Sequence, residues 1–255
     1  MIKIVKEKIK SSKGNLSAAV HYPEKETGKL AILCSGFLDS KDYAHLVGLA
    51  DALAGEGYVA VRFDATGIWE SEGDISEYTT TQYLEDIKNV LEFMLSRSDY
   101  GHILLGGHSR GGMVSIIYAS KDPRISAVLG IMPSPGGKET PDEKKEKWRK
   151  DGFKISTRDV PGDEEKTVEF KVPFAHVEDK EKYDAIEKVK EVKVPVILFA
   201  GEKDDVILPE WVRMIYDNAN EPKKFILIPG IDHDYRHNDS EIDFVNGKII
   251  HELIQ

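Results

Sequence analysis

The chain has 255 residues, enough for one large domain or for one domain that carries an insertion. Its 45 acidic residues outnumber its 35 basic ones, and the formal net charge of −10 argues against nucleic acids and anionic membranes as partners. A single cysteine, Cys34, excludes a disulfide within the chain and argues against a cysteine-based metal site.

The N-terminal residues alternate between apolar and charged side chains and lack the apolar core of a signal peptide. No apolar stretch in the sequence is long enough to cross a membrane. We therefore expect a cytoplasmic protein with no membrane partner. The macromolecular partner that we expect is a second copy of the chain, in a homodimer.

Along the chain, the apolar pattern predicts strands that alternate with helices. Continuous apolar runs such as Leu30–Cys34 are typical of strands buried on both faces. This alternation favours an α/β fold with a mostly parallel, doubly wound sheet of about eight strands. The expected strands are 2–10, 15–22, 30–34, 58–63, 103–105, 125–131, 194–200 and 225–228, and the expected helices are 42–56, 79–97, 110–120, 209–219 and 239–254.

Residues 133–190 interrupt this rhythm, because they contain no clear unit of a strand followed by a helix. A charged run, 142–151, is followed by short β-like pieces, and the whole segment is too long for a plain loop. We interpret residues 133–190 as an inserted cap or lid, and residues 1–132 and 191–255 as the core. A surface excursion without a catalytic part is the alternative.

The motif G-x-S-x-G occurs at Gly107-His108-Ser109-Arg110-Gly111, between a predicted strand and a predicted helix. This context is that of a nucleophile elbow, a turn so sharp that the residues two before and two after the serine must be small. Gly107 and Gly111 meet this requirement. We predict that Ser109 is a nucleophile; a glycine-rich turn without chemistry is the alternative.

A serine hydroxyl needs a base, and the base needs an orienting acid, which in elbows of this kind follow in the order serine, acid, histidine. Asp204 lies just after the strand 194–200 and is the preferred acid, with Asp205 as the second candidate. His233 follows the last strand and is the preferred base, whereas His237 lies in a polar stretch and is interpreted as a loop residue.

Three further residues near the predicted catalytic ones are not expected to take part in catalysis or to bind a metal. His108 neighbours the nucleophile in sequence but points differently on the elbow, so we expect it to be a packing residue. Asp232 and Asp234 flank His233 without a matching second set of ligands, and we therefore predict no metal and no cofactor.

Acyl transfer also needs two N–H donors for the oxyanion. The first expected donor is the backbone N–H of Arg110, at the start of a helix. The second is the N–H of Phe37, in the loop that follows the strand 30–34, where Gly36 permits close approach. An ordinary turn between a strand and a helix is the alternative for this loop.

With these motifs in place, the chain resembles the α/β-hydrolase superfamily over nearly its whole length. The resemblance rests on five segments: Ser35-Gly36-Phe37, Arg62–Gly67 with Ser71-Glu72-Gly73, the elbow, Gly201–Asp204 and Gly230–His233. Within the superfamily it is most similar to bacterial cinnamoyl and feruloyl esterases. It departs from their pattern at Ser35, where they carry histidine, and at Ile68-Trp69-Glu70, where they carry Gly-x-Gly.

The resemblance implies a serine esterase with an acyl-enzyme intermediate that acts on small or aromatic, cinnamoyl-type esters. We expect its substrate pocket to include Leu38, Trp69 and Trp148. A peptidase, a thioesterase or a monoacylglycerol lipase would use the same three catalytic residues and is the alternative within enzymes. A non-catalytic binding protein on the same scaffold is the alternative outside them.

Overall fold

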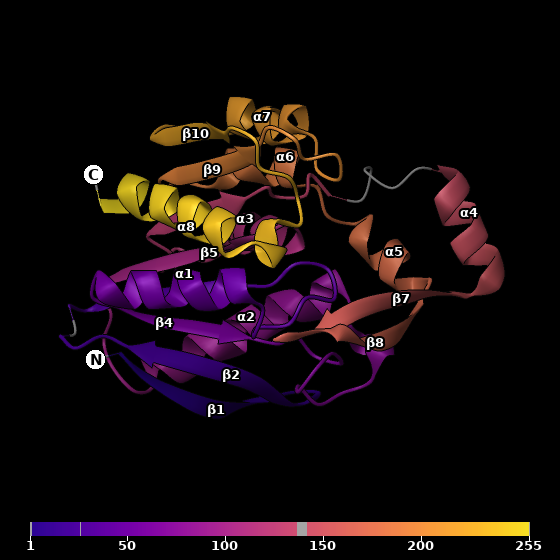
Figure 1. The fold of residues 1–255 in the computed structure, drawn as a ribbon, viewed down its shortest axis with the longest axis horizontal. Helices are drawn as coiled ribbons and strands as arrows, with labels where there is room; N and C mark the ends of the chain where they lie inside the picture. The colour runs from indigo at the N-terminus through magenta and orange to yellow at the C-terminus, as the bar shows by residue number, and fades with distance from the viewer. Residues whose placement is uncertain (1, 26, 137–141, 255) are drawn as a thin grey trace.

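The computed structural model describes residues 2–25, 27–136 and 142–254. An eight-stranded sheet forms its centre, in the order β1-β2-β4-β3-β5-β6-β9-β10 (Figure 1). The strands of this sheet are β1 (Lys3–Ser11), β2 (Gly14–Tyr22), β3 (Lys29–Cys34), β4 (Tyr58–Phe63), β5 (His102–His108), β6 (Ala127–Ile131), β9 (Val196–Gly201) and β10 (Lys223–Ile228).

The sheet is antiparallel at one side and parallel elsewhere. The strand β2 pairs antiparallel with both β1 and β4, and all the other pairs are parallel. In the parallel part the strands end at one edge, and the loops that leave this edge carry the residues of the candidate site. The mostly parallel α/β fold predicted from the sequence is confirmed.

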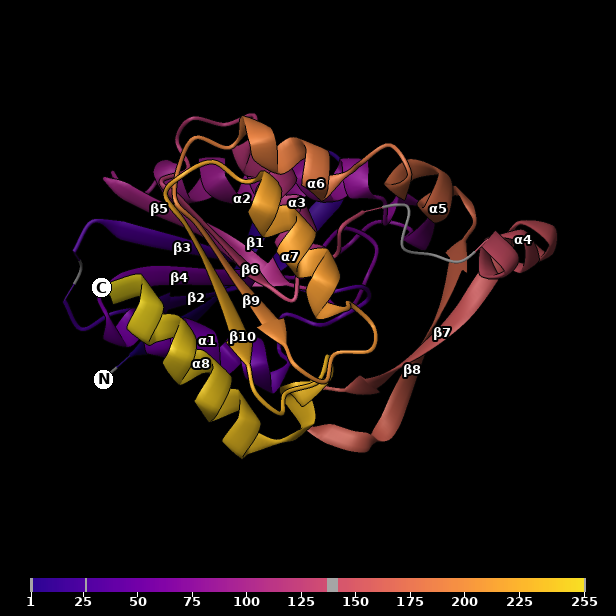
Figure 2. The ribbon, with the colours of Figure 1, turned by 90° about the horizontal axis from the view of Figure 1, so that it is seen from above.

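Two layers of helices cover the two faces of the sheet (Figure 2). The helices of these layers are α1 (Ala44–Gly55), α2 (Thr80–Leu95), α3 (Arg110–Ala119), α7 (Pro209–Asn218) and α8 (Asp239–Ile254). Side chains alternate between the faces: along β3, Leu30 and Ile32 pack with residues of α2, α3 and α7, whereas Ala31 and Leu33 pack with residues of α1 and α8. Both faces are therefore buried, which explains the continuous apolar runs of the central strands.

The segment 133–190 lies at the edge of the sheet where the parallel strands end. The charged run forms α4 (Asp142–Asp151), and the β-like pieces form a hairpin of β7 (Phe153–Val160) and β8 (Asp163–Pro173), followed by α5 (Ala175–Lys180) and α6 (Ala185–Lys188). The helix α4 lies farthest from the sheet, at the end of the hairpin (Figures 1 and 2).

The inserted segment leaves the core and returns to it inside the predicted bounds of 133–190. Gly136 forms an isolated bridge with Asp184, and the N–H of Ala185 donates to the carbonyl of Pro135 at 2.9 Å. The helix α6 then packs against α3 and α7 of the core. The chain thus returns to the core at residue 184, before the predicted boundary at 190.

Within the described ranges, no helix combines the length and the apolarity needed to cross a membrane.

Candidate active site

Ser109 occupies a strained turn between β5 and α3. Its backbone has φ 54° and ψ −117°, a conformation that residues other than glycine rarely adopt. A Cβ atom at Gly107 or at Gly111 would collide with the carbonyl oxygen of Cys34, so only glycine fits at either position. The N–H of Ser109 donates to the carbonyl of Ile131 at 2.9 Å. The elbow predicted from the motif is therefore the conformation observed.

Three side chains from three loops form a hydrogen-bonded chain at this elbow. The ring Nε2 of His233 lies 3.0 Å from Oγ of Ser109, and its Nδ1 lies 2.8 Å from Oδ2 of Asp204. The carboxylate can only accept, so Nδ1 carries the proton and Nε2 accepts from the serine hydroxyl. All three side chains are buried. This arrangement is suited to remove the hydroxyl proton during nucleophilic attack.

Asp204 is held firmly by its own loop. Its Oδ1 accepts the N–H groups of Val206 at 2.9 Å and Ile207 at 2.7 Å, which leaves Oδ2 for the histidine. The second candidate acid, Asp205, is exposed, and His237 lies in the 3₁₀ turn Tyr235–His237 rather than beside Ser109. Of the alternatives left open by the sequence, the structure brings Asp204 and His233 to Ser109.

The two expected oxyanion donors, Phe37 and Arg110, both line the cavity that contains Ser109. Arg110 is the first residue of α3, so its N–H has no acceptor within the helix. The carbonyl of Phe37 accepts two hydrogen bonds from Arg158 of β7, from Nε at 3.3 Å and from Nη2 at 2.9 Å. The inserted hairpin therefore fixes the loop that carries Phe37.

Of the three residues expected in the substrate pocket, Trp148 lines this cavity, whereas Leu38 and Trp69 do not. Leu38 is fully buried with φ 60°, and its N–H donates to Oη of Tyr78 at 2.7 Å. The indole N–H of Trp69 donates to the carbonyl of Leu38 at 2.8 Å. Both hydrogen bonds fix the backbone of Leu38, so Tyr78 and Trp69 support the loop that carries Phe37.

The cavity measures about 1060 Å³ and lies between the sheet edge and the inserted segment. Trp148 of α4, Phe153 of β7 and His176 of α5 contribute to the part of its wall that the inserted segment forms. The ring of His176 stacks on Trp148, with ring centroids 6.1 Å apart, and its Nδ1 bonds to the carbonyl of Tyr78 at 2.8 Å. Burial, followed by the charge of Arg110, lowers the pKa of His176 to about 3, so this ring is neutral at physiological pH.

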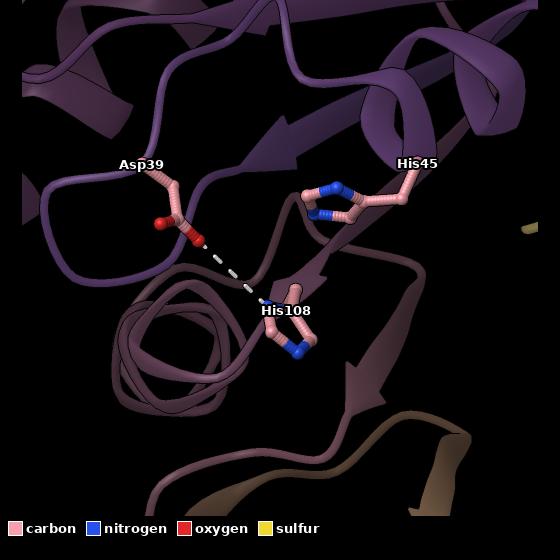
Figure 3. Close-up of side chains that lie close together, drawn as sticks. All are labelled: Asp39, His45 and His108. Carbon is pink, nitrogen blue, oxygen red and sulfur yellow. Dashed lines mark ion pairs between the residues drawn. The ribbon is translucent and has the colours of Figure 1, made fainter. Parts of the chain in front are cut away.

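Next to His233 lies a second group of histidine and aspartate side chains, from parts of the chain that are far apart in the sequence. The carboxylate of Asp39 points toward Nδ1 of His108 at 3.9 Å, and the ring of His45 lies beside them (Figure 3). His108 packs against His233 with ring centroids 4.6 Å apart, in agreement with its predicted packing role. The only sequence signal for Asp39 is its place two residues after Phe37.

The charges around this second group favour an ionised Asp39 and neutral histidines. Burial would raise the pKa of Asp39, but the nearby His108 ring and the charge of Arg158 lower it to about 2. Burial lowers the pKa of His45 to about 3. The ligand atoms of Asp39, His45 and His108 lie within 4.8 Å of one another, close enough to hold a metal ion. However, Arg158 Nε lies 3.6 Å from Asp39 Oδ1, and this cation would repel a metal there. The absence of a metal stays a prediction.

This chain is similar to a known protein family and to several individual proteins. The family model described as serine aminopeptidase, S33, matches residues 25–155, just over half of the chain. An uncharacterized 31.7 kDa protein in the traX-finO intergenic region of Escherichia coli is 25% identical over 220 residues, which cover 74% of this chain and 77% of that protein. A mitochondrial palmitoyl-protein thioesterase of Mus musculus, ABHD10, is 24% identical over 191 residues, which cover 72% of this chain and 61% of that protein.

Among solved structures, Est1E from Butyrivibrio proteoclasticus with bound ferulic acid superposes with a TM-score of 0.77 at 20% identity, covering 97% of this chain and 98% of that one. At this level of identity the likeness shows the fold alone. That fold is the α/β-hydrolase fold, as the sequence motifs implied.

Proposed function

We propose that this chain, which belongs to the serine aminopeptidase S33 family of α/β-hydrolases, is a serine carboxylic-ester hydrolase that works through an acyl-enzyme. The observation that carries the proposal is the buried hydrogen-bonded chain from Ser109 through His233 to Asp204, with distances of 3.0 and 2.8 Å. A non-catalytic binding protein would have no need to keep all three groups aligned on a strained elbow.

In the proposed reaction, Oγ of Ser109 attacks the ester carbonyl while Nε2 of His233 takes the hydroxyl proton. Asp204 stabilises the imidazolium that results, and the N–H groups of Phe37 and Arg110 receive the oxyanion. The histidine then gives its proton to the leaving alcohol. Water repeats the sequence on the acyl-enzyme, releasing the acid and restoring the free serine.

The proposed substrates are small or aromatic esters, including cinnamoyl-type esters, bound in the cavity of about 1060 Å³. This size admits an aromatic acyl group together with its alcohol. A thioester is the second candidate, because one curated relative is named a palmitoyl-protein thioesterase. We propose no cofactor and a location in the cytoplasm.

A fluorophosphonate probe tests the central claim, because it reacts with a serine only where a base activates it. We expect one label per intact chain, located at Ser109 by mass spectrometry, and none in Ser109→Ala. An unlabelled wild-type protein, or equal labelling of Ser109→Ala, would refute the proposal. p-Nitrophenyl, hydroxycinnamoyl, thioester and aminoacyl-amide substrates then separate esterase from thioesterase and peptidase by their relative kcat/KM.

A further inference from the structure

The charge of the cavity wall is opposite to that of the protein as a whole. The chain has a net charge of −10. Among the described residues that line the cavity, seven are lysine or arginine and three are aspartate, the acidic ones being Asp39, Asp151 and Asp234. Such a local reversal raises the concentration of anions in a cleft. The basic residues are Arg110, Lys144, Lys147, Lys154, Arg158, Lys180 and Arg236.

Arg110 is the member of this set that lies next to the nucleophile, and its side chain is 2% exposed. None of its three guanidinium nitrogens has a hydrogen-bond partner among the described residues. The group lies over the ring of Tyr78, 4.2 Å from the ring centroid. A buried guanidinium without a hydrogen-bonded acceptor costs several kcal/mol of desolvation, a cost that a bound anion offsets.

The neighbouring acid does not fill this role. The Arg110 charge favours ionisation of Asp86, but burial is the larger effect and raises the pKa of that carboxyl. Both Asp86 oxygens are already engaged, by the backbone and hydroxyl of Thr66 and by the amide of Gln82. Arg110 also interacts with a second basic group of the cavity. Burial, followed by the charge of Arg110, lowers the pKa of the cavity residue Lys180 to about 7.

At the mouth of the cavity, Lys144 and Lys147 of α4 and Lys154 of β7 form no ion pair with any residue that the structure describes. Burial lowers the pKa of Lys154, and the charges of Arg158 and Lys144 lower it further. These basic neighbours repel one another, and none of the three is paired with a carboxylate of the described residues. The strand β7 extends from α4 toward the edge of the sheet where the parallel strands end (Figure 2).

We propose that the substrate carries an anionic group, a carboxylate or a phosphate, and that Arg110 binds this group beside Ser109. The planar guanidinium pairs with either anion through two parallel hydrogen bonds. The mouth lysines attract the anion into the cavity. This inference rests on the proposed hydrolase function and narrows its substrates to esters with negative charge in the acyl or the alcohol part.

Matched chromogenic esters test the inference. Mono-p-nitrophenyl glutarate carries an acyl carboxylate, its methyl ester is the neutral counterpart, and an analogue with a terminal phosphonate represents phosphate. The pair 3-carboxy-4-nitrophenyl pentanoate and p-nitrophenyl pentanoate places the charge on the leaving group instead. We expect kcat/KM to be roughly tenfold or more higher for at least one anionic ester than for its neutral partner. The pair of esters that shows the preference identifies the anion, and it shows whether the acyl or the alcohol part of the substrate carries that anion.

Within each variant, the ratio of anionic to neutral kcat/KM is the quantity to compare. In Arg110→Gln we expect this ratio to fall to near one, and in Arg110→Lys we expect part of it to remain. The double variant Lys144→Met/Lys147→Met alters exposed side chains and leaves Arg110 in place. It should raise KM for the anionic ester and weaken the dependence of kcat/KM on salt. The double variant Lys3→Met/Lys10→Met makes the same change of net charge on the edge strand β1 and should leave the ratio unchanged.

Neutral esters hydrolysed as fast as every anionic partner would overturn the inference while leaving the hydrolase proposal intact. A preference that survives Arg110→Gln in full would overturn the role of Arg110. Failure of the hydrolase proposal itself looks different, because neither class of ester would then be turned over and no probe would label Ser109.

Discussion

Two pairs of aspartate and histidine lie buried at the same edge of the sheet, and they differ in how tightly they are joined. Asp204 contacts His233 at 2.8 Å, whereas Asp39 approaches His108 only to 3.9 Å. The second oxygen of Asp204 accepts two backbone N–H groups of its own loop. The second oxygen of Asp39 faces Arg158 of the inserted hairpin.

The difference shows what separates an orienting acid from a nearby acid of the same type. The backbone of its own loop occupies one oxygen of the Asp204 carboxylate, and the other oxygen bonds to His233, which in turn contacts Ser109. The Asp39 carboxylate is shared between His108 and a cation that holds the Phe37 carbonyl. We therefore expect the first pair to govern proton transfer and the second to support the loop that carries an oxyanion donor.

Asp204→Asn is the substitution expected to have the largest effect. An asparagine favours the wrong tautomer of His233 and leaves the imidazolium unstabilised, so kcat should fall by roughly 10³ to 10⁴. Steady-state hydrolysis of a p-nitrophenyl ester measures this loss. Asp205→Asn removes the same charge one residue later on an exposed side chain and should retain full activity. A greater loss at Asp205 would reverse the assignment of the acid.

Asp39→Asn should have a smaller effect on activity. The change removes a partly buried ion pair of about 1 kcal/mol and loosens Arg158, so kcat should fall about fivefold. Asp205→Asn again serves as the control for charge. A loss as large as that of Asp204→Asn would mean that the two pairs act as one catalytic unit, and a double variant would then show no further loss.

The third expected effect concerns the pH dependence of stability and leaves activity at neutral pH unchanged. The folded pKa of His45, about 3, lies below the ordinary value of 6.5, so folding favours its neutral form. The stability from this group is complete above pH 6.5 and is lost as the pH falls toward 3. The slope is up to about 1.4 kcal/mol per pH unit for each such proton.

Urea unfolding at several pH values measures this slope. His45→Phe replaces a ring whose nitrogens have no described partner with one of similar shape, and it should remove one proton from the slope between pH 4 and 6. His102→Phe is a control on a less buried histidine, whose pKa is lowered by burial and by the charge of Lys29. An unchanged slope in His45→Phe would show that this ring is already charged in the folded protein.

The three residues proposed to act in catalysis were predictable because each follows directly from a strand. The elbow motif fixes Ser109, and the loops after the strands 194–200 and 225–228 contain few acids and histidines from which to choose. The central strands were predictable for a related reason, since burial on both faces produces continuous apolar runs.

The rest depends on contacts between distant segments. Nothing local in the sequence indicates that His45 of α1 reaches His108 of β5, or that Trp69 bonds to the Leu38 carbonyl. The run that forms α4 lacks an apolar stripe, so it had no helical signal. The sequence predicts a role for the backbone N–H of Arg110. That its guanidinium has no hydrogen-bond partner among the described residues depends on how the surrounding loops fold.

The hydrogen bonds from Arg158 to the Phe37 carbonyl limit how freely the inserted segment can be exchanged between related proteins. The inserted hairpin supplies part of the substrate wall and also holds the loop proposed to stabilise the reacting oxygen. It is therefore not an exchangeable module. A chimera that receives the insert of a relative without an equivalent of Arg158 changes the rate of the chemical step together with the choice of substrate.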